Sequence, residues 1–169
     1  MHLFEKLSPQ VYDDLIKRTV VRLNGDVDRA RDVVQEAFAK AILKRHQLRD
    51  ETKFEHWLSV IVKNETLYEL RRTAEQYKRA ILVSDDSDYD YMPLKHDRST
   101  EDIVLTRIEL EQFASYVESL PGLTKQIIVL HSEDGLSFRE ISKLVGMPLE
   151  SVKARYYRAF QRYSHLERE

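Results

Sequence analysis

The chain has 169 residues, of which 33% are charged, with four glycines, four prolines and no cysteine. The lack of cysteine excludes disulfides, cysteine-ligated zinc and thiol catalysis, and the few glycines and prolines favour a helix-rich protein. The sequence has neither an apolar run long enough to span a membrane nor the apolar core of a signal peptide, so we expect a cytoplasmic protein that makes no membrane contact.

The net charge of −2 conceals an uneven distribution. Residues 1–72 contain 14 Lys and Arg against 12 Asp and Glu, and residues 116–169 contain 8 against 7. The segment between them, residues 73–115, contains 5 against 10. Two mildly basic segments joined by an acidic one are typical of a protein that contacts nucleic acid at two places, rather than of a nonspecific polycation.

Three amphipathic helices are predicted within residues 1–72. The first has an apolar stripe from Val11 to Leu23 and ends at Asn24-Gly25. Either Asp26 or Asp28 can cap the second helix, whose apolar stripe consists of Val33, Val34, Ala37, Phe38, Ala41 and Ile42. A polar loop over residues 46–53 then leads to the third helix.

The apolar positions of the third helix are Phe54, Trp57, Leu58, Ile61, Val62, Leu67 and Leu70, and the helix is expected to end at Arg71-Arg72. Trp57 shares its period with Phe54 and Leu58, so we expect its ring in the core rather than exposed as a stacking platform for a base. Three helices with apolar faces can bury one core, and residues 1–72 are therefore predicted to form a small α domain.

A linker is predicted over residues 73–112. Residues 84–100 contain five acidic side chains and no helical period, which is typical of a flexible or loosely docked segment. Helical periodicity resumes near Ile103 and stops at Leu120-Pro121-Gly122. The fold class is therefore all-α, with two small helical domains, residues 1–72 and 113–169, joined by a flexible acidic linker.

The segment 136–164 has the pattern of a helix-turn-helix. Ser137 and Glu140 form a predicted capping box, Gly146 supplies a turn with positive φ, and Pro148 suits the start of the next helix. In that helix Val152, Tyr156, Ala159 and Tyr163 are expected to face inward. Lys153, Ala154, Tyr157 and Arg158 are expected to face outward, with Arg155 and Arg162 on the flanks. A basic, aromatic helix after a tight turn favours DNA binding over a helical hairpin with a solvated basic face.

These motifs together resemble those of bacterial sigma factors of the extracytoplasmic-function type. In the first domain the resemblance lies in Asp32–Phe38 (DVVQEAF), in Phe54–Asn64 (FEHWLSVIVKN) and in Leu70-Arg71-Arg72. In the second it lies in Leu120-Pro121, in Gly135–Ile141 (GLSFREI) and in Ser151–Ala159 (SVKARYYRA). Two blocks in the same order on either side of a linker make the resemblance specific. It implies a subunit that binds core RNA polymerase and recognises the −10 and −35 promoter elements.

For the first domain, the resemblance implies that Asp32, Gln35 and Glu36 bind the coiled-coil clamp of the polymerase β′ subunit. Without the resemblance, Asp32 and Glu36 would indicate only an acidic face on a solvated helix. The implied contacts to the −10 element are Arg49, Thr52 and Lys53 in the polar loop, then Lys63, Asn64, Arg71 and Arg72. Asn64 can pair with a base edge because its amide both donates and accepts.

For the second domain, the resemblance implies contact with the −35 element and with the polymerase β flap. The implied −35 residues are His131, Ser137, Lys153, Ala154, Arg155, Tyr157 and Arg158. Lys and Arg can pair with guanine O6 and N7, and Ala or a ring edge can contact a thymine methyl group. Arg155 is expected to contact the backbone, and His131 and Ser137 to lie near phosphates.

Three other classes of protein fit the sequence less well. Enzymatic activity is not expected, because the six histidines lack metal-binding spacing and no glycine-rich phosphate loop occurs, and no metal or cofactor is predicted. An ordinary helix-turn-helix repressor or response regulator would place a ligand-binding or receiver domain before the DNA-binding helices, where this chain has a helical domain. A sigma mimic that binds only a regulator would not need Asn64, Lys153 and Arg158.

We also expect an anti-sigma factor as a partner. An exposed polymerase-binding face and an acidic tether would allow such a partner to cover that helix or to lie between the two domains. Because the chain has no cysteine, redox or zinc sensing would have to reside in the partner.

Overall fold

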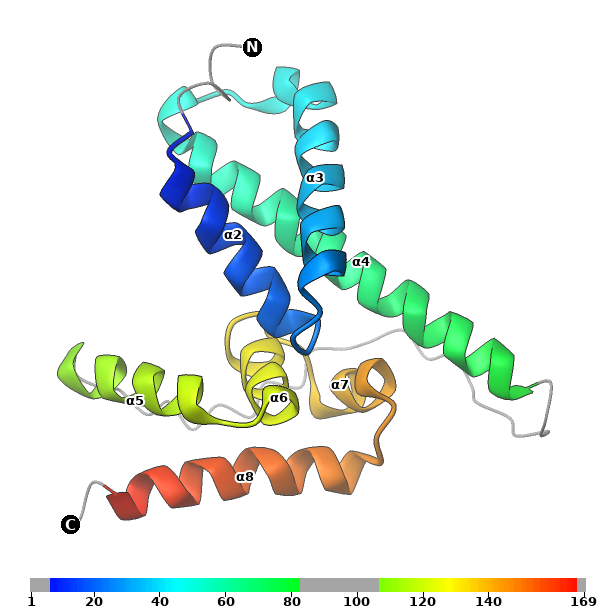
Figure 1. Ribbon diagram of the computed structural model, residues 1–169, viewed down its shortest axis with the longest axis vertical. Coiled ribbons are helices and arrows are strands. Elements are labelled where there is room, and N and C mark those ends of the chain that lie inside the picture. Colours follow the sequence, from blue (N-terminus) through cyan, green and yellow to red (C-terminus); the bar gives the residue numbers. More distant parts are fainter. Residues whose placement is uncertain (1–6, 83–106, 167–169) are drawn as a thin grey trace. The chain divides into compact units, whose positions relative to one another are not determined.

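A computed structural model of the protein describes residues 7–82 and 107–166 (Figure 1). Over these residues the chain forms seven α-helices, two short 3-10 helices and no strand. It divides into two compact units, Met1–Gln76 and Tyr77–Glu169, called unit 1 and unit 2 below. The predicted all-α fold with two helical domains is thus confirmed. None of the described helices has the combination of length and apolar character that a membrane span requires.

Unit 1 begins with α2 (Pro9–Arg22) and α3 (Val27–Leu43). The Ser8 side chain caps α2, and the Asp26 carboxylate caps α3 by accepting a hydrogen bond from the Arg29 amide at 3.0 Å. Between the two helices the backbone turns through positive φ angles of 54° at Asn24 and 93° at Gly25. Asn and Gly are residue types that tolerate the left-handed region of backbone conformation. The first helix therefore ends at the Asn24-Gly25 turn, as predicted.

The third helix of unit 1, α4 (Phe54–Leu82), follows two 3-10 turns, η1 (Arg45–Gln47) and η2 (Glu51–Lys53), within the predicted polar loop. Its first turns lie against α2 and α3, and its later turns extend past them (Figure 1). The core is a cluster of Leu15, Val34, Ala37, Ala41, Phe54, Leu58 and Val62. Trp57 is half-buried and packs against this cluster, as expected, with its ring centroid 6.2 Å from that of Phe54.

Two predictions for unit 1 are wrong. Ile42 was expected on the buried stripe of α3, but 58% of it is exposed, since it lies in the last turn of the helix, next to the still more exposed Leu43. The third helix was expected to end at Arg71-Arg72, but α4 continues to Leu82. The residues that follow Arg72 are mainly good helix formers, and neither glycine nor proline occurs before Pro93, so nothing local stops the helix.

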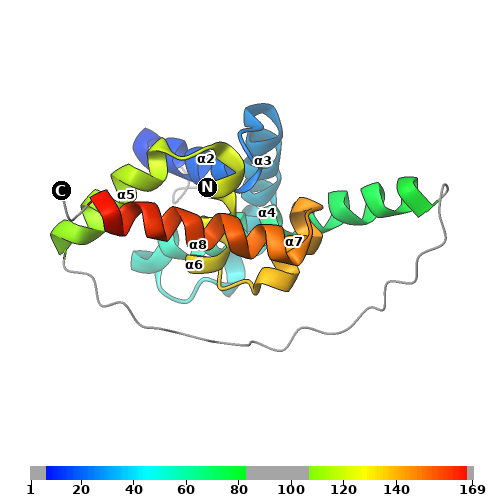
Figure 2. The ribbon, with the colours of Figure 1, turned by 90° about the horizontal axis from the view of Figure 1, so that it is seen from below.

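Unit 2 contains α5 (Arg107–Ser119), α6 (Gly122–Ser132), α7 (Phe138–Val145) and α8 (Leu149–Leu166). The break between α5 and α6 falls at the predicted Leu120-Pro121-Gly122. Helix α8 runs along the other helices of the unit (Figures 1 and 2), and its contact with α5 includes a hydrogen bond from the Tyr116 hydroxyl to the Ala159 carbonyl at 2.8 Å. The predicted linker segment 84–100 lies outside the described residues, and the limits 73 and 112 stay predictions.

Candidate nucleic-acid interface

The helix-turn-helix of unit 2 is held together by local hydrogen bonds. The Ser137 amide donates to the Glu140 carboxylate at 2.7 Å, and the Glu140 amide donates to the Ser137 hydroxyl at 3.2 Å, which is the predicted capping box. At the other end of α7, Gly146 adopts φ 66° and ψ 32°, as predicted. The Pro148 carbonyl then accepts hydrogen bonds from the backbone amides of Ser151 and Val152 in the first turn of α8. The turn and the start of α8 are therefore fixed by the sequence itself.

One face of α8 is buried and the opposite face is open. Val152, Ala159 and Tyr163 are buried and Tyr156 is half-buried, so the expected inward stripe is confirmed. The side chains predicted to read DNA lie on the other side, where Arg155, Tyr157 and Arg158 are exposed and Lys153 and Ala154 are half-buried. The Lys153 amine lies 3.1 Å from the Glu150 carboxylate in an exposed pair that contributes little to stability. This face is basic and accessible.

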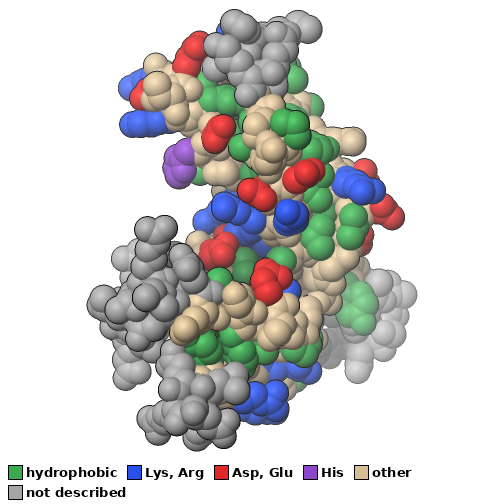
Figure 3. All heavy atoms as spheres, turned by 60° about the vertical axis from the view of Figure 1, so that its left-hand side comes forward, with side chains coloured by type: hydrophobic (Ala, Val, Ile, Leu, Met, Phe, Trp, Pro, Cys, Tyr) green, Lys and Arg blue, Asp and Glu red, His purple; other side chains and the backbone are tan. Residues whose placement is uncertain are grey.

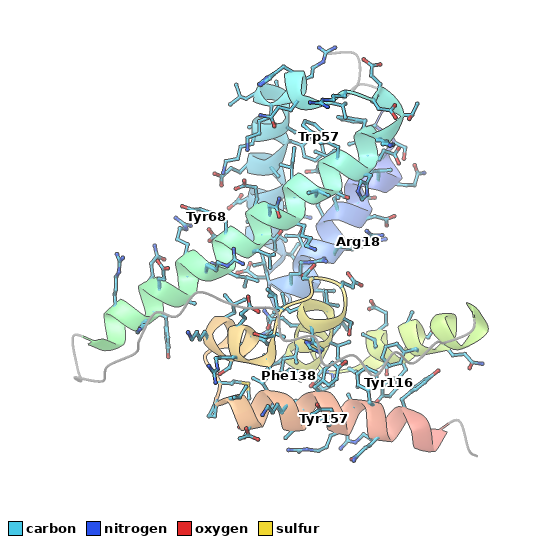
Figure 4. The ribbon with its side chains drawn as sticks, turned by 180° about the vertical axis from the view of Figure 1, so that it is seen from behind. Arg18, Trp57, Tyr68, Tyr116, Phe138 and Tyr157 are labelled. Atoms are coloured by element: carbon cyan, nitrogen blue, oxygen red, sulfur yellow. The ribbon has the colours of Figure 1, made fainter. Side chains whose placement is uncertain are left out.

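Aromatic rings fix how α8 sits on α7. The Phe138 ring contacts that of Tyr156 at a centroid distance of 5.0 Å and that of Tyr157 at 5.9 Å, between the two helices (Figure 4). Although 55% of Tyr157 is exposed, its ring is thus held from one side. Burial raises the pKa of the Tyr156 hydroxyl, which stays protonated at neutral pH.

His131 and Ser137, both predicted near DNA phosphates, have structural partners. The His131 ring stacks on Phe138 at 4.2 Å, and its Nδ1 lies 2.7 Å from the Leu136 carbonyl. Since a carbonyl can only accept, Nδ1 carries the proton and only Nε2 is left for a ligand. Both residues are half-buried, and the capping box engages the Ser137 hydroxyl oxygen.

In unit 1, the residues predicted to bind polymerase lie on the outer face of α3. Asp32, Gln35 and Glu36 are exposed, whereas the intervening Val33 and Val34 are buried. Glu36 accepts from the Lys40 amine at 3.0 Å, and the same amine reaches Glu65 on α4 at 2.5 Å. Hydrogen bonds from Glu65 and then Glu36 raise the pKa of Lys40. The acidic face of α3 is thereby tied to α4, an interaction that no local pattern in the sequence indicated.

The predicted −10 residues of the loop before α4 form a short ordered turn. Arg49, Thr52 and Lys53 are all exposed. The Asp50 carboxylate accepts from the Thr52 hydroxyl at 2.6 Å and from the Thr52 amide at 3.0 Å, and these bonds lower the pKa of Asp50. The Thr52 hydroxyl therefore stabilises the turn, and the Lys53 amine lies 3.9 Å from the Asp50 carboxylate in an exposed pair.

Helix α4 does not bring all four of its predicted DNA contacts to one face. At 3.6 residues per turn, Asn64 and Arg71 lie on the same face, whereas Lys63 and Arg72 are roughly 180° apart. Asn64, Arg71 and Arg72 are exposed and Lys63 is half-buried. A strand that follows one face of α4 can therefore contact Asn64 and Arg71 together, but not Lys63 and Arg72 at once.

Arg72 instead belongs to a network between α3 and α4. The Glu69 carboxylate accepts from Arg72 Nε at 2.8 Å and from Arg29 of α3 at 2.8 and 3.0 Å, and Arg29 also donates to Thr73. The hydrogen bond from Arg72, together with Arg29, lowers the pKa of Glu69 despite partial burial. Sequence reasoning missed Arg29 and Glu69 because they are 40 positions apart.

Charged side chains of both signs are visible on one face of the protein. In the space-filling view, Lys and Arg side chains are interspersed with Asp and Glu in unit 1, and basic side chains gather on α8 (Figure 3). The described residues contain no cluster of His, Asp and Glu that could hold a metal ion. A mixed surface with local basic patches suits site-specific rather than indiscriminate contact with nucleic acid.

Comparison with known proteins gives two family matches. Residues 9–76 match the family Sigma-70 region 2, and residues 110–162 match the family Sigma-70, region 4. The chain is 28% identical over 150 residues to the ECF RNA polymerase sigma factor SigW of Bacillus subtilis, covering 88% of this chain and 80% of that protein. It is 33% identical over 141 residues to the ECF RNA polymerase sigma-E factor of Escherichia coli, covering 80% and 71%.

Among solved structures, that of the sigma factor RpoE from Bartonella quintana in complex with the anti-sigma factor NepR is similar to this chain. The alignment covers 94% of this chain and 92% of the other, with 20% sequence identity and a TM-score of 0.41. A likeness at this level says nothing about function.

Proposed function

Because the chain belongs to the extracytoplasmic-function type of the sigma-70 family, we propose that it binds core RNA polymerase and directs transcription initiation at promoters with particular −10 and −35 elements. The observation that carries the proposal is the exposed basic face of α8, held by the capping box and by Gly146 in the geometry of a helix-turn-helix. The proposal assigns no catalytic residue to this chain.

In this proposal the acidic face of α3 binds the clamp of the polymerase β′ subunit. Asp32, Gln35 and Glu36 are exposed on consecutive turns, so they can meet a basic partner without rearrangement of the helix. Unit 2 would bind the β flap while α8 faces the DNA. Two weak sites gain affinity when one polymerase scaffold fixes the distance between them.

Unit 1 would recognise the −10 element in its opened form. A base is accessible only after unstacking, so recognition needs donors for the single strand and a polar group for the base. Arg49, Thr52 and Lys53 supply the loop, Asn64 supplies the amide, and Lys63, Arg71 and Arg72 supply cations. All of these side chains are exposed except Lys63, which is half-buried, and this accessibility supports these roles. Because Lys63 and Arg72 lie on opposite faces of α4, they would contact different parts of the DNA.

Unit 2 would recognise the −35 element through the major groove. Lys153, Ala154, Tyr157 and Arg158 would face the base edges, and Arg155 on the flank would contact phosphate. His131 and Ser137 would stabilise the approach to the backbone, His131 through Nε2 and Ser137 through the start of α7, since their other groups have partners in the protein.

Run-off transcription tests the proposal as a whole. Purified core polymerase would be combined with this protein, and promoters would be selected from a random DNA library by the complex. When the protein is present, we expect transcripts that start at a single position, and when it is absent we expect none. Equal transcription by core polymerase alone on the selected DNA would refute the proposal, and a sigma mimic would bind its regulator without yielding transcripts.

Variants of α3 test the polymerase contact. Gln35→Ala and Glu36→Ala should weaken binding to core polymerase, whereas Asp28→Ala, a matched exposed acid on the same helix, should not. If all three bind core polymerase equally, the contact lies elsewhere.

We further propose control by an anti-sigma factor that covers the same face of α3. Such a partner would compete with polymerase because both need Asp32, Gln35 and Glu36, all exposed here. The product of a neighbouring gene that prevents the protein from binding core polymerase, and that binds Glu36→Ala more weakly, would support this. A partner that binds simultaneously with polymerase would refute it.

A further inference from the structure

An exposed aromatic side chain lies beside the acidic face of α3. Tyr68 on α4 is 60% exposed and is labelled in Figure 4. It stands between Glu65 and Glu69, the two α4 residues that form ion pairs with α3. No sequence motif assigned a role to Tyr68, because the polymerase-binding residues implied by the resemblance all lie on α3. What surrounds its ring depends on how α4 packs against α3.

Two interactions connect Tyr68 to Glu36, one of the residues assigned to polymerase binding. The Lys40 amine lies 5.8 Å from the centre of the Tyr68 ring and 3.0 Å from the Glu36 carboxylate, so one ammonium group contacts both side chains. Arg72, one turn further along α4, has its pKa raised mainly by its hydrogen bond to Glu69, and Tyr68 and Glu36 both raise it further. Tyr68 and Glu36 are therefore neighbours on one surface, although they belong to different helices.

The rotation of α4 places Tyr68 at the border of two surfaces. At 3.6 residues per turn, its side chain is about 40° from that of Asn64, on the proposed DNA face, and about 40° from that of Arg72 in the other direction. A base stacked on the ring is the alternative that this position allows. Because the ring contacts Lys40 of α3, the position favours the macromolecule that binds α3.

The chemistry of this surface suits a basic protein partner. Asp32 and Glu36 are exposed and supply negative charge, and the Tyr68 ring adds apolar area next to them. A tyrosine ring can accept an arginine or lysine of the partner over its face, and tyrosine is enriched among the few interface residues that contribute most of the binding energy. We infer that Tyr68 extends the polymerase-binding surface of α3 onto α4 and anchors the contact with the β′ clamp. This inference rests on the proposed function.

The test compares Tyr68→Ala with Tyr77→Ala in binding to core polymerase without DNA. Tyr77 is the matched control, since it is a tyrosine of the same helix, is 66% exposed and lies just beyond unit 1. Tyr68→Ala should weaken binding about tenfold or more, as truncation of an anchoring aromatic does. Tyr77→Ala should stay within about twofold of the wild type, as should Tyr68→Phe, which keeps the ring.

Salt distinguishes an aromatic anchor from a charge. The loss of affinity caused by Glu36→Ala should shrink at high salt, because exposed charges are screened. The loss caused by Tyr68→Ala should persist, because burial of apolar surface is not screened. Urea unfolding followed by Trp57 fluorescence checks for a merely structural role. Tyr68→Ala should unfold at the same urea concentration as the wild type, since its side chain is exposed.

The inference is overturned if the wild type binds core polymerase but Tyr68→Ala and Tyr77→Ala bind it equally well. It is also overturned if Tyr68→Ala binds core polymerase normally and the resulting complex instead loses affinity for single-stranded DNA of the −10 region, because the ring would then stack on a base. A loss as large in Tyr68→Phe as in Tyr68→Ala would exclude the ring as the anchor. Failure of the wild type to bind core polymerase would instead refute the proposed function.

Discussion

Replacing Glu69 by glutamine should destabilise unit 1 while leaving its shape unchanged. The Glu69 side chain is only 14% exposed and accepts hydrogen bonds from Arg29 of α3 and Arg72 of α4. The change Glu69→Gln removes the negative charge between two guanidinium groups but keeps the volume of the side chain. Helix α3 would then lose the ion pair between Arg29 and Glu69 that joins it to α4, whereas the Lys40–Glu65 pair would remain.

The magnitude follows from how buried each partner is. Arg72 is 54% exposed, so its pair with Glu69 should contribute close to nothing after solvent screening. Arg29 is 29% exposed and makes two charged hydrogen bonds to Glu69, at 2.8 and 3.0 Å. Exchanging a charged for a neutral acceptor there should cost about 1–2 kcal/mol, and each kcal/mol lowers the melting temperature of a domain of this size by about 4–8 °C.

The assay uses the single tryptophan of the chain. Trp57 packs against the core of unit 1, so its fluorescence during urea unfolding of the full protein reports on that unit. Glu75→Gln removes an exposed acid from the same helix and serves as the matched control. If Glu69→Gln and Glu75→Gln unfold at the same urea concentration as the wild type, the network does not stabilise unit 1.

The difference in unfolding free energy between the wild type and Glu69→Gln should also depend on pH. The pKa of Glu69 is lower in the folded protein than its ordinary value of 4.5, because Arg72 and Arg29 bind the charged form. The contribution of Glu69 to the unfolding free energy is therefore complete at pH values above its ordinary pKa. That contribution is lost as the pH falls through the lower pKa of the folded protein. A difference in unfolding free energy that is constant from pH 7 down to the acid-unfolding range would contradict this.

Four further predictions concern unit 2. Lys153→Ala and Arg158→Ala should each weaken binding to a selected −35 element by about 1–3 kcal/mol and relax the base preference at particular positions, as measured by competition with single-base variants. Arg155→Ala should weaken binding equally on all sequences and reduce the salt slope by about one unit, and a base-specific loss would show that it reads bases instead. Ser137→Ala removes the capping box and should lower the unfolding free energy of unit 2 by about 1 kcal/mol, measured by circular dichroism. Gly146→Ala places a Cβ at φ 66° with open space around it, so backbone strain alone should cost about 1–2 kcal/mol, and an unchanged melting curve would argue against that strain.

The local features of this protein were predictable because they depend on residues within one or two turns of each other. The capping box at Ser137, the left-handed turn at Gly146 and the buried stripe of α8 each follow from spacing along a single helix. The Asn24-Gly25 turn is of the same kind. The two motif blocks, which lie in continuous stretches of sequence, pointed to the sigma-factor family for the same reason.

The errors at the helix ends have a different origin. Ile42 continues the apolar period of α3 but is exposed, because burial depends on whether another element covers that turn. The extension of α4 beyond Arg72 depends on the absence of a stop signal, which a basic pair does not provide. A periodic pattern says which face of a helix is apolar, but not how far along the helix that face is covered.

Only the tertiary structure decided which charged groups meet. The pairs Arg29–Glu69 and Lys40–Glu65 join α3 to α4 across 40 and 25 positions, and a small pocket between α2 and α4 is lined by Arg18 and Arg22 of α2 and by Lys63 of α4. Such contacts depend on how each helix is rotated about its axis and where it crosses its neighbour, and these are set by the packing of the shared core. The sequence therefore identified the residues on α4 that carry charge, whereas helix packing determined that Arg29 of α3 meets Glu69 and that Lys63 lies near Arg18 and Arg22 of α2.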